Sequence, residues 1–221
     1  MIELKNITKI YNLGKSNEVI ALKEINMKIE KGKITAITGP SGCGKTTLLS
    51  IIGLILTPTK GELFYDGENV LKFSDYWKTI FRRNKFGFIF QHINLLPQYT
   101  AIENILLPLY SMDLNPMDYI EKAIELLSRL RVLDRAKNKV EQLSGGEQQR
   151  VAFVRALIKD PEYLFADEPT VFVDEETSHI IYNLLQELRD KGKTIVISTH
   201  DQELLKIADK VYRLVNGRLI Q

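Results

Sequence analysis

A short glycine-rich segment carries the clearest chemical signal in the sequence. Residues 39–46 fit the pattern G-x-x-x-x-G-K-[ST] without a gap: they are Gly39, Pro40, Ser41, Gly42, Cys43, Gly44, Lys45 and Thr46. Glycines let the backbone curl so that successive N–H groups point at an anion. The lysine adds positive charge toward the β- and γ-phosphates of a nucleotide, and the threonine hydroxyl can bind Mg²⁺. We therefore expect this loop, continued by Thr47, to bind nucleotide phosphates.

The segments on either side of the loop match what phosphate binding requires. The apolar segment Ile34–Thr38 predicts a buried strand before the loop, and residues 48–54 belong to an apolar helix that begins near Lys45. The positive end of that helix faces the anion. A glycine-rich turn with an unrelated lysine is the alternative, and this context disfavours it. Cys43 is either a thiol whose modification blocks nucleotide binding or a small side chain that fills space.

Two carboxylates and a histidine follow two other apolar segments. Residues 163–166 predict a buried strand that ends at Asp167 and Glu168. Asp167 can hold the Mg²⁺ shell, and Glu168 can polarise the attacking water as a general base. His200 follows the segment Thr194–Ser198 and can hydrogen-bond the γ-phosphate and orient the water. Adjacent carboxylates are often surface residues and a lone histidine is usually structural, but the buried strands favour catalytic roles here.

A second possible anion site lies in the middle of the sequence. It is the run Leu143, Ser144, Gly145, Gly146, Glu147, Gln148, Gln149 and Arg150. Ser144 with Glu147 three residues later predicts a capping box, and two glycines leave the first backbone N–H groups of the helix uncovered. A second anion site beside a single phosphate loop is explained most simply if it binds the nucleotide held by another copy of the chain.

Several segments are expected to position these residues. Ile2–Tyr11, residues 19–30 and residues 61–66 predict strands, and Lys210–Val215 predicts another. Short strands buried on both faces are typical of a parallel sheet, whose ligands bind at the carboxyl ends of the strands. The fold class we predict is α/β: a P-loop NTPase core with a mostly parallel sheet, an antiparallel β subdomain and a helical subdomain.

Residues 92–160 differ from the rest because they carry helix signals and almost no strand signals. Asn115 followed by Pro116 predicts a helix start, with Asp118 in the first turn. Four apolar residues then follow at helical spacing and predict a core-facing stripe: Ile120, Ile124, Leu127 and Leu130. We therefore expect one domain over 1–221, with a core of 1–91 and 161–221 and a helical subdomain of 92–160.

Composition excludes several classes of protein. The 221 residues are 44% hydrophobic and 26% charged, and a net charge of +2 gives no reason to expect a nucleic-acid partner. The single cysteine rules out an internal disulfide and fits a reducing compartment. The first residues resemble no signal peptide, and the longest apolar run is far shorter than the ~20 residues that span a bilayer. We expect a cytoplasmic protein.

The run L-S-G-G-E-Q-Q-R resembles the signature motif of the ABC ATPases. Other motifs follow in that family's order over essentially the whole chain. The resemblance implies that Tyr11 stacks on adenine, that Asp174 is the D-loop aspartate and that His200 is the H-loop histidine. Gln91, which closes the strand predicted over 86–90, matches the Q-loop glutamine and is expected both to bind Mg²⁺ and to take part in catalysis. Asp167 and Glu168 match the Walker-B pair.

The resemblance also implies how the protein assembles. ABC ATPases form a head-to-tail dimer with two ATPs sandwiched between the subunits. Each ATP would contact the phosphate loop of one copy and Ser144, Gly145 and Gly146 of the other, with Asp174 at the crossing. A groove near Gln91 would receive the coupling helices of membrane-spanning permease subunits. The chain would then act as a peripheral protein on the inner face of the cell membrane.

Residues 88–97, with the sequence F-I-F-Q-H-I-N-L-L-P, resemble one branch of the family. That branch serves macrolide export, lipoprotein release, antimicrobial-peptide resistance and cell division. The main hypothesis is an ATPase that powers export, extraction or mechanical transmission through separate membrane subunits. The second is a regulatory ATPase that drives a membrane partner and moves no substrate. A soluble ABC protein of DNA repair or translation is disfavoured, because those proteins carry two cassettes or a long coiled coil.

One segment departs from the branch. Where relatives commonly read P-T-G-N-L-D, residues 169–174 read P-T-V-F-V-D. Val171 would be strained if the glycine it replaces supplied a positive φ. Phe172 is predicted either to wedge the dimer interface or to pack against its partner.

Overall fold

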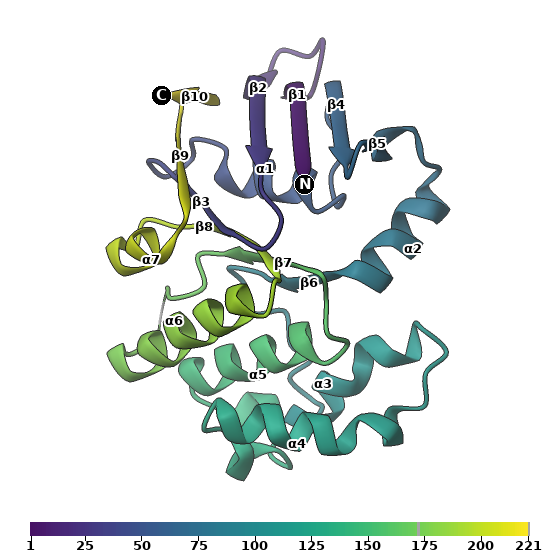
Figure 1. The fold of residues 1–221 in the computed structure, drawn as a ribbon, viewed down its shortest axis with the longest axis vertical. Helices are drawn as coiled ribbons and strands as arrows, with labels where there is room; N and C mark the ends of the chain where they lie inside the picture. The colour runs from purple at the N-terminus through teal and green to yellow at the C-terminus, as the bar shows by residue number, and fades with distance from the viewer. Residues whose placement is uncertain (172, 221) are drawn as a thin grey trace.

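The computed structural model describes residues 1–171 and 173–220. In this part of the chain the strands form two sheets, and helices cover both sides of the larger one. Figure 1 shows the smaller sheet at one end of the long axis and helices α3 (Ala101–Tyr110) and α4 (Ile120–Arg129) at the other. The sheet that carries the predicted catalytic residues lies between these ends.

The smaller sheet is antiparallel. Its strands are β1 (Ile2–Tyr11), β2 (Val19–Ile29), β4 (Lys60–Tyr65) and β5 (Glu68–Asn69), in the spatial order β2-β1-β4-β5. Three of these strands are predicted from the sequence, with ends that differ by at most one residue, and β5 is not. Register shifts in the pairing of β1 with β2 bend this sheet.

The larger sheet is parallel except at one edge. Its strands are β3 (Ile34–Thr38), β6 (Phe86–Ile89), β7 (Tyr163–Asp167), β8 (Thr194–Ser198), β9 (Lys210–Val215) and β10 (Arg218–Ile220). Their spatial order is β10-β9-β3-β8-β7-β6, and β10 is the antiparallel edge strand. Because β3, β8, β7 and β6 run in the same direction, their carboxyl ends meet at one edge.

Alternate residues of the parallel strands contact two different cores. Phe165 and Val196 pack with helix α1 (Lys45–Ile52) and the antiparallel sheet. Leu164 and Ile195 pack on the other side with the helices α3, α4, α5 (Gly145–Leu157) and α6 (Glu175–Asp190). Side chains of a strand alternate between its two faces, so a short, wholly apolar strand requires a core on each side. The predicted α/β fold with these two additions is confirmed.

Three helices of the described residues are not predicted from the sequence: α6 and the two described next. Helix α2 (Asp75–Lys85) has no buried residue and is therefore invisible to a search for an apolar stripe. It is favoured instead by Ser74, whose hydroxyl accepts a hydrogen bond from Trp77 N, and by basic residues in its last turn. Helix α7 (Gln202–Ile207) is short and is capped by Asp201.

The helical middle of the chain is confirmed, with one error in its buried face. Asn115 caps a 3₁₀ turn, Pro116–Tyr119, and α4 starts only after it. Leu127 and Leu130 are buried as predicted, but Ile124 is 44% exposed. Ala123 and Leu126 are buried in its place, so the buried face of α4 is rotated relative to the predicted stripe. The other short turns are Val70–Lys72, Leu133–Arg135 and Val140–Gln142.

None of the helices in the described ranges combines the length and apolar character that a membrane crossing requires.

The corrected face of α4 gives a first testable prediction. Leu127→Ala should lower the free energy of unfolding by about 2–5 kcal/mol, because it leaves a cavity in the core. Ile124→Ala should change it by no more than about 0.5 kcal/mol, because that side chain is largely in water. Urea unfolding measures both values. Similar losses at the two positions would contradict the orientation of α4.

Candidate active site

A cavity of about 560 Å³ lies at the edge of the larger sheet where the carboxyl ends of the parallel strands meet. It is lined by Gly39, Pro40, Ser41, Gly42, Gly44, Lys45, Thr46, Thr47, Gln91, Asp167, Glu168, Val171 and His200. All of these except Val171 are predicted site residues. The structure therefore brings together residues that lie up to 161 positions apart, from Gly39 to His200.

The phosphate loop needs glycine at two positions for steric reasons. Gly39 has φ 153°, and a Cβ there would lie 2.0 Å from the carbonyl oxygen of Leu214. Gly44 has φ 108°, and a Cβ would lie 2.6 Å from the carbonyl oxygen of Ala21. Gly44 is also the N-cap of α1, so the chain turns from the loop directly into the helix. The first residues of α1 then present the positive end of the helix to the cavity.

Lys45 is held inside the loop by main-chain oxygens. Its Nζ donates hydrogen bonds to the carbonyl oxygens of Gly39 at 2.9 Å and Pro40 at 3.3 Å. It also lies 3.7 Å from Oε1 of Glu168. Both side chains are nearly buried, at 11% and 10% exposure, so their charges are poorly screened by solvent. The ammonium group is thus placed between the loop and the predicted general base.

Glu168 also contacts the histidine. Nδ1 of His200 lies 2.9 Å from Oε2 of Glu168, although the ring N–H is not aligned to make a hydrogen bond. The His200 side chain is 70% exposed and so borders the open side of the site. Glu168 therefore has Lys45 on one side and His200 on the other, as a carboxylate that polarises a water next to a phosphate would require.

Asp167 lies deeper than Glu168, at the last position of β7. It is 4% exposed and accepts a hydrogen bond from the hydroxyl of Ser198, its partner in the β7–β8 pairing. The carboxylate still lines the cavity, together with Thr46 and Gln91. The three residues predicted to bind Mg²⁺ are therefore brought to one place.

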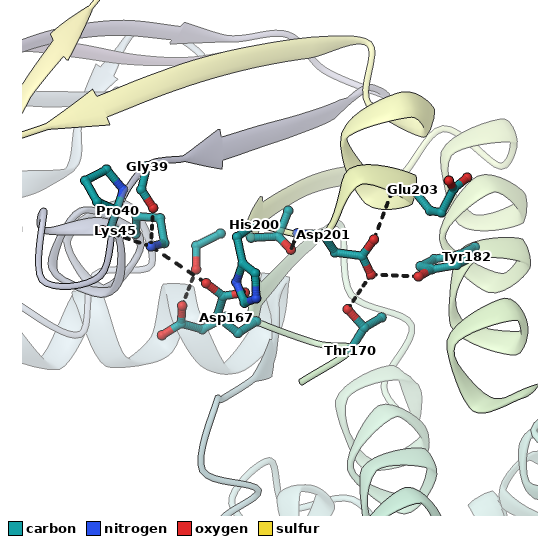
Figure 2. Close-up of polar contacts among 12 residues, drawn as sticks. Gly39, Pro40, Lys45, Asp167, Thr170, Tyr182, His200, Asp201 and Glu203 are labelled. Atoms are coloured by element: carbon teal, nitrogen blue, oxygen red, sulfur yellow. Dashed lines mark hydrogen bonds and ion pairs between the residues drawn. The ribbon is translucent and has the colours of Figure 1, made fainter. Parts of the chain in front are cut away.

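A network on the outer side of His200 is missed by the sequence analysis. The hydroxyls of Tyr182 and Thr170 both donate to Oδ2 of Asp201, at 2.6 and 2.7 Å, as Figure 2 shows. Burial alone would raise the pKa of Asp201, but these hydrogen bonds and those from the α7 backbone outweigh it, so the pKa is lowered. Burial, and then the bond to Asp201, raise the pKa of Tyr182 to about 12. The network ties the residue after His200 to the segment after Glu168.

The predicted capping box at the start of α5 is confirmed. Ser144 Oγ accepts from Glu147 N, and Glu147 Oε2 accepts from Ser144 N at 2.8 Å. Ser144, Gly145 and Gly146 do not line the cavity formed by the described residues. Gly146 instead lies against α6, where a Cβ would be 3.2 Å from Oγ1 of Thr177.

Three further predicted residues lie at the margin of the site. Tyr11 is 38% exposed at the end of β1, and its hydroxyl is 3.4 Å from Oγ1 of Thr47. Asp174 caps α6, and hydrogen bonds from the backbone and side chain of Thr177 lower its pKa. The Cys43 side chain is 5% exposed and packs in the core around α1. This burial favours its interpretation as a small space-filling side chain.

Residues 169–174, which depart from the sequence common in the branch, are described by the structure except at position 172. Val171 lines the cavity and is not among the described non-glycine residues with positive φ, so the strain considered for it is not found. Glu168 itself carries the positive φ, at 47°. The predicted roles of Phe172 fall on a residue outside the described ranges.

Comparison with known families decides the classification. The family profile described as ABC transporter matches residues 22–171, which is more than half of the chain. The chain belongs to the ABC transporter family. The predicted family, the fold and the role as an ABC-type ATP-binding ATPase subunit are therefore confirmed.

Individual members of the ABC family are similar over the whole chain. The uncharacterized ABC transporter ATP-binding protein MJ1508 from Methanocaldococcus jannaschii is 45% identical, covering 100% of this chain and 98% of that protein. The lipoprotein-releasing system ATP-binding protein LolD from Bacteroides thetaiotaomicron is 40% identical, covering 99% of each. The dimeric structure of the ABC cassette MJ0796 aligns with a TM-score of 0.94 and 39% identity, covering 100% of this chain and 97% of that one.

The Asp201 network gives a second prediction. A carboxylate with a lowered pKa in the folded state stabilises the protein above its usual pKa of 3.8, and that contribution disappears as pH falls through the folded-state value. Asp201→Asn should therefore lower the free energy of unfolding at pH 6, and the difference from the original protein should shrink as pH falls below about 4. Tyr182→Phe, which removes one donor, should give a smaller effect. A pH-independent difference in urea unfolding would contradict this account.

Proposed function

We propose that this chain hydrolyses ATP with Glu168 as the general base, and that two copies act together to drive a separate membrane-spanning partner. The observation that carries the proposal is the position of Glu168 between Lys45 and His200, inside a cavity formed by the phosphate loop. The phosphate loop supplies backbone donors, Lys45 supplies positive charge, and Glu168 supplies a base on the same side.

In the proposed reaction the protein accepts a proton but forms no covalent bond to the phosphate. A water between Glu168 and the γ-phosphate gives up a proton toward the carboxylate as its oxygen attacks phosphorus, and ADP leaves. His200 orients the water and the γ-phosphate from the open side of the cavity. When ATP binds, Lys45 exchanges the carbonyl oxygens of Gly39 and Pro40 for phosphate oxygens.

The residues present also fit Mg²⁺. This ion prefers oxygen ligands and is usually bound through one or two carboxylates together with substrate phosphates. Thr46, Gln91 and Asp167 provide a hydroxyl, an amide and a carboxylate on one cavity wall. No group of three or more His, Cys, Asp or Glu residues suited to a metal occurs in the described ranges, which agrees with an ion that depends on the nucleotide. Bound there, Mg²⁺ would neutralise charge on the phosphates.

A head-to-tail pair explains the residues that the cavity leaves out. Ser144, Gly145 and Gly146 form an uncovered helix start that lies outside the cavity, and Asp174 lies beside them. In the proposed dimer they contact the ATP held by the other copy, with Tyr11 on the adenine. The similarity to the dimeric cassette MJ0796 supports this arrangement, and a second, dimeric structure of that cassette is a post-hydrolysis state bound to ADP and Pi.

The membrane partner is proposed from the relatives. The macrolide export protein MacB from Hyphomonas neptunium is named an ATP-binding/permease protein, and this chain covers 34% of it at 42% identity. We propose that permease subunits bind near Gln91 and the helical subdomain of 92–160, which is distinct from a core of 1–91 and 161–221. The chain would then lie on the inner face of the cell membrane. A regulatory ATPase that moves no substrate uses the same site and remains the second hypothesis.

Glu168→Gln tests the central chemical step. The amide keeps the shape of the side chain but cannot accept the proton, so kcat should fall by about 10²–10⁴. ATP binding should persist, and with ATP the variant should elute as a dimer in size-exclusion chromatography. Phosphate release and the elution volume are the measurements. Turnover near the original rate would remove Glu168 from the role of base.

Lys45→Ala tests the phosphate loop separately. Loss of the ammonium should weaken ATP binding by about tenfold or more, because a charge-assisted contact to the β- and γ-phosphates is removed. Lys33, an exposed lysine paired with Asp209, provides a control: Lys33→Ala should leave affinity unchanged. Calorimetric titration with a non-hydrolysable ATP analogue measures both. Equal affinity for Lys45→Ala and the original protein would contradict the proposed binding mode.

A further inference from the structure

The backbone at Glu168 is in an unfavourable conformation. Its φ of 47° lies in the left-handed region, which residues with a Cβ adopt only at a cost. Such a residue persists when its neighbours fix it. The groups that hold the segment therefore determine where the Glu168 carboxylate points.

Main-chain hydrogen bonds fix both the N–H and the carbonyl group of Glu168. Its N–H donates to the carbonyl oxygen of Ser198 at 2.9 Å, which continues the β7–β8 pairing. Its carbonyl oxygen accepts from Val171 N at 3.2 Å, which closes a turn over Pro169 and Thr170. These bonds define the turn. They do not involve the carbonyl of Pro169 at its centre, which another group must bind.

That carbonyl is bound by a side chain from α5, the signature helix, which begins at the run of residues 143–150. Nε2 of Gln149 donates to the Pro169 carbonyl oxygen at 3.0 Å, and Gln149 is 3% exposed. A buried hydrogen bond of this kind is not weakened by competition with water. Gln149 lies in the second turn of α5, whose first turn carries Ser144 as its cap. One short helix therefore contacts both the proposed second anion site and the strained turn at Glu168.

We propose that Gln149 is a positioning residue that holds Glu168 in its catalytic orientation through the Pro169 carbonyl. This rests on the proposed role of Glu168 as the base. In the head-to-tail dimer, the helix that contacts the partner's ATP through Ser144 then also sets the geometry of the base in its own subunit. Gln149 thereby links the hydrolysis step at one site to the docking of α5 at the other.

The anchors of α5 allow this bond to be removed selectively. Arg155 donates to the carbonyl oxygens of Asn94 at 2.7 Å and Ile93 at 3.1 Å, and Arg150 donates to the hydroxyl of Thr177. Phe153 and Val154 are fully buried in the core. Gln149→Met keeps the length of the side chain and removes the donor, so α5 should remain in place while the turn at Glu168 loses its constraint.

The experiment measures ATP hydrolysis by the full-length protein. Gln149→Met should lower kcat by about three- to tenfold, the size expected for one hydrogen bond, while KM for ATP stays within twofold. Leu127→Ala is the control for stability, because it weakens a core position on α4 that does not line the cavity. At a temperature where it is folded, its kcat should match that of the original protein. Equal kcat losses in both variants would overturn the proposal.

A second variant separates positioning from packing. Gln149→Glu introduces a carboxyl that repels the Pro169 carbonyl when ionised and donates to it when protonated. Burial at this position raises the pKa of a carboxyl group, so protonation increases as pH falls from 8 to 6. The ratio of its kcat to that of the original protein should rise over this range. A ratio that stays flat in a folded variant would show that Gln149 only packs, and would overturn the proposal.

Glu168→Gln, measured in parallel, keeps the two proposals apart. If it is inactive while Gln149→Met turns over at the original rate, the positioning role fails and the proposed function stands. If Glu168→Gln remains active, the proposed function fails, and the positioning role fails with it.

Discussion

Every residue of β7 and β8 is buried, and alternate residues face two different cores. Neither face of the sheet can then accept a catalytic polar group without removing apolar contacts, so the polar residues gather where the strands end. Asp167, Glu168 and His200 all lie at or just beyond those ends, and the phosphate loop follows β3 in the same way. The two-sided core thus places the polar site residues at the strand ends, and the loops determine only how their side chains are oriented.

The balance of charge at this edge follows from that position. Glu168 is nearly buried, and an ionised carboxylate there would be unfavourable without partners. Lys45 provides a positive charge 3.7 Å from one carboxylate oxygen, and His200 lies 2.9 Å from the other. Binding of a phosphate chain places more negative charge beside Glu168, which the helix start of α1 and Lys45 must offset. Lys45, which stabilises the carboxylate in the structure, is therefore also needed by the substrate, so the site can hold the proposed base and an anion close together.

Features that neighbouring residues in the sequence specify can be predicted, whereas those that depend on contacts between distant residues cannot. Ile34–Thr38 and Thr194–Ser198 are predicted with correct ends because local apolar composition specifies a strand buried on both faces. The phosphate loop is specified by consecutive residues. In contrast, Asp201 and Gln149 acquire their roles from partners 31 and 20 positions away, Thr170 and Pro169, and no local pattern marks them. Helix α2 was missed because it buries no apolar residue, and the exposure of Ile124 because the buried face of α4 depends on how the helices pack.

The segment after Glu168 shows why such long-range contacts matter for catalysis. Its turn is held on one side by Gln149 from the signature helix and on the other by Thr170, which donates to Asp201 beside His200. The left-handed backbone at Glu168 is thus held in place by one contact from α5 and one from the segment beside His200. A shift of either motif would move the proposed base, and a small movement would be enough because proton abstraction depends on hydrogen-bond distance. The strained turn is therefore the point at which the placement of α5 and the placement of His200 act on the same carboxylate.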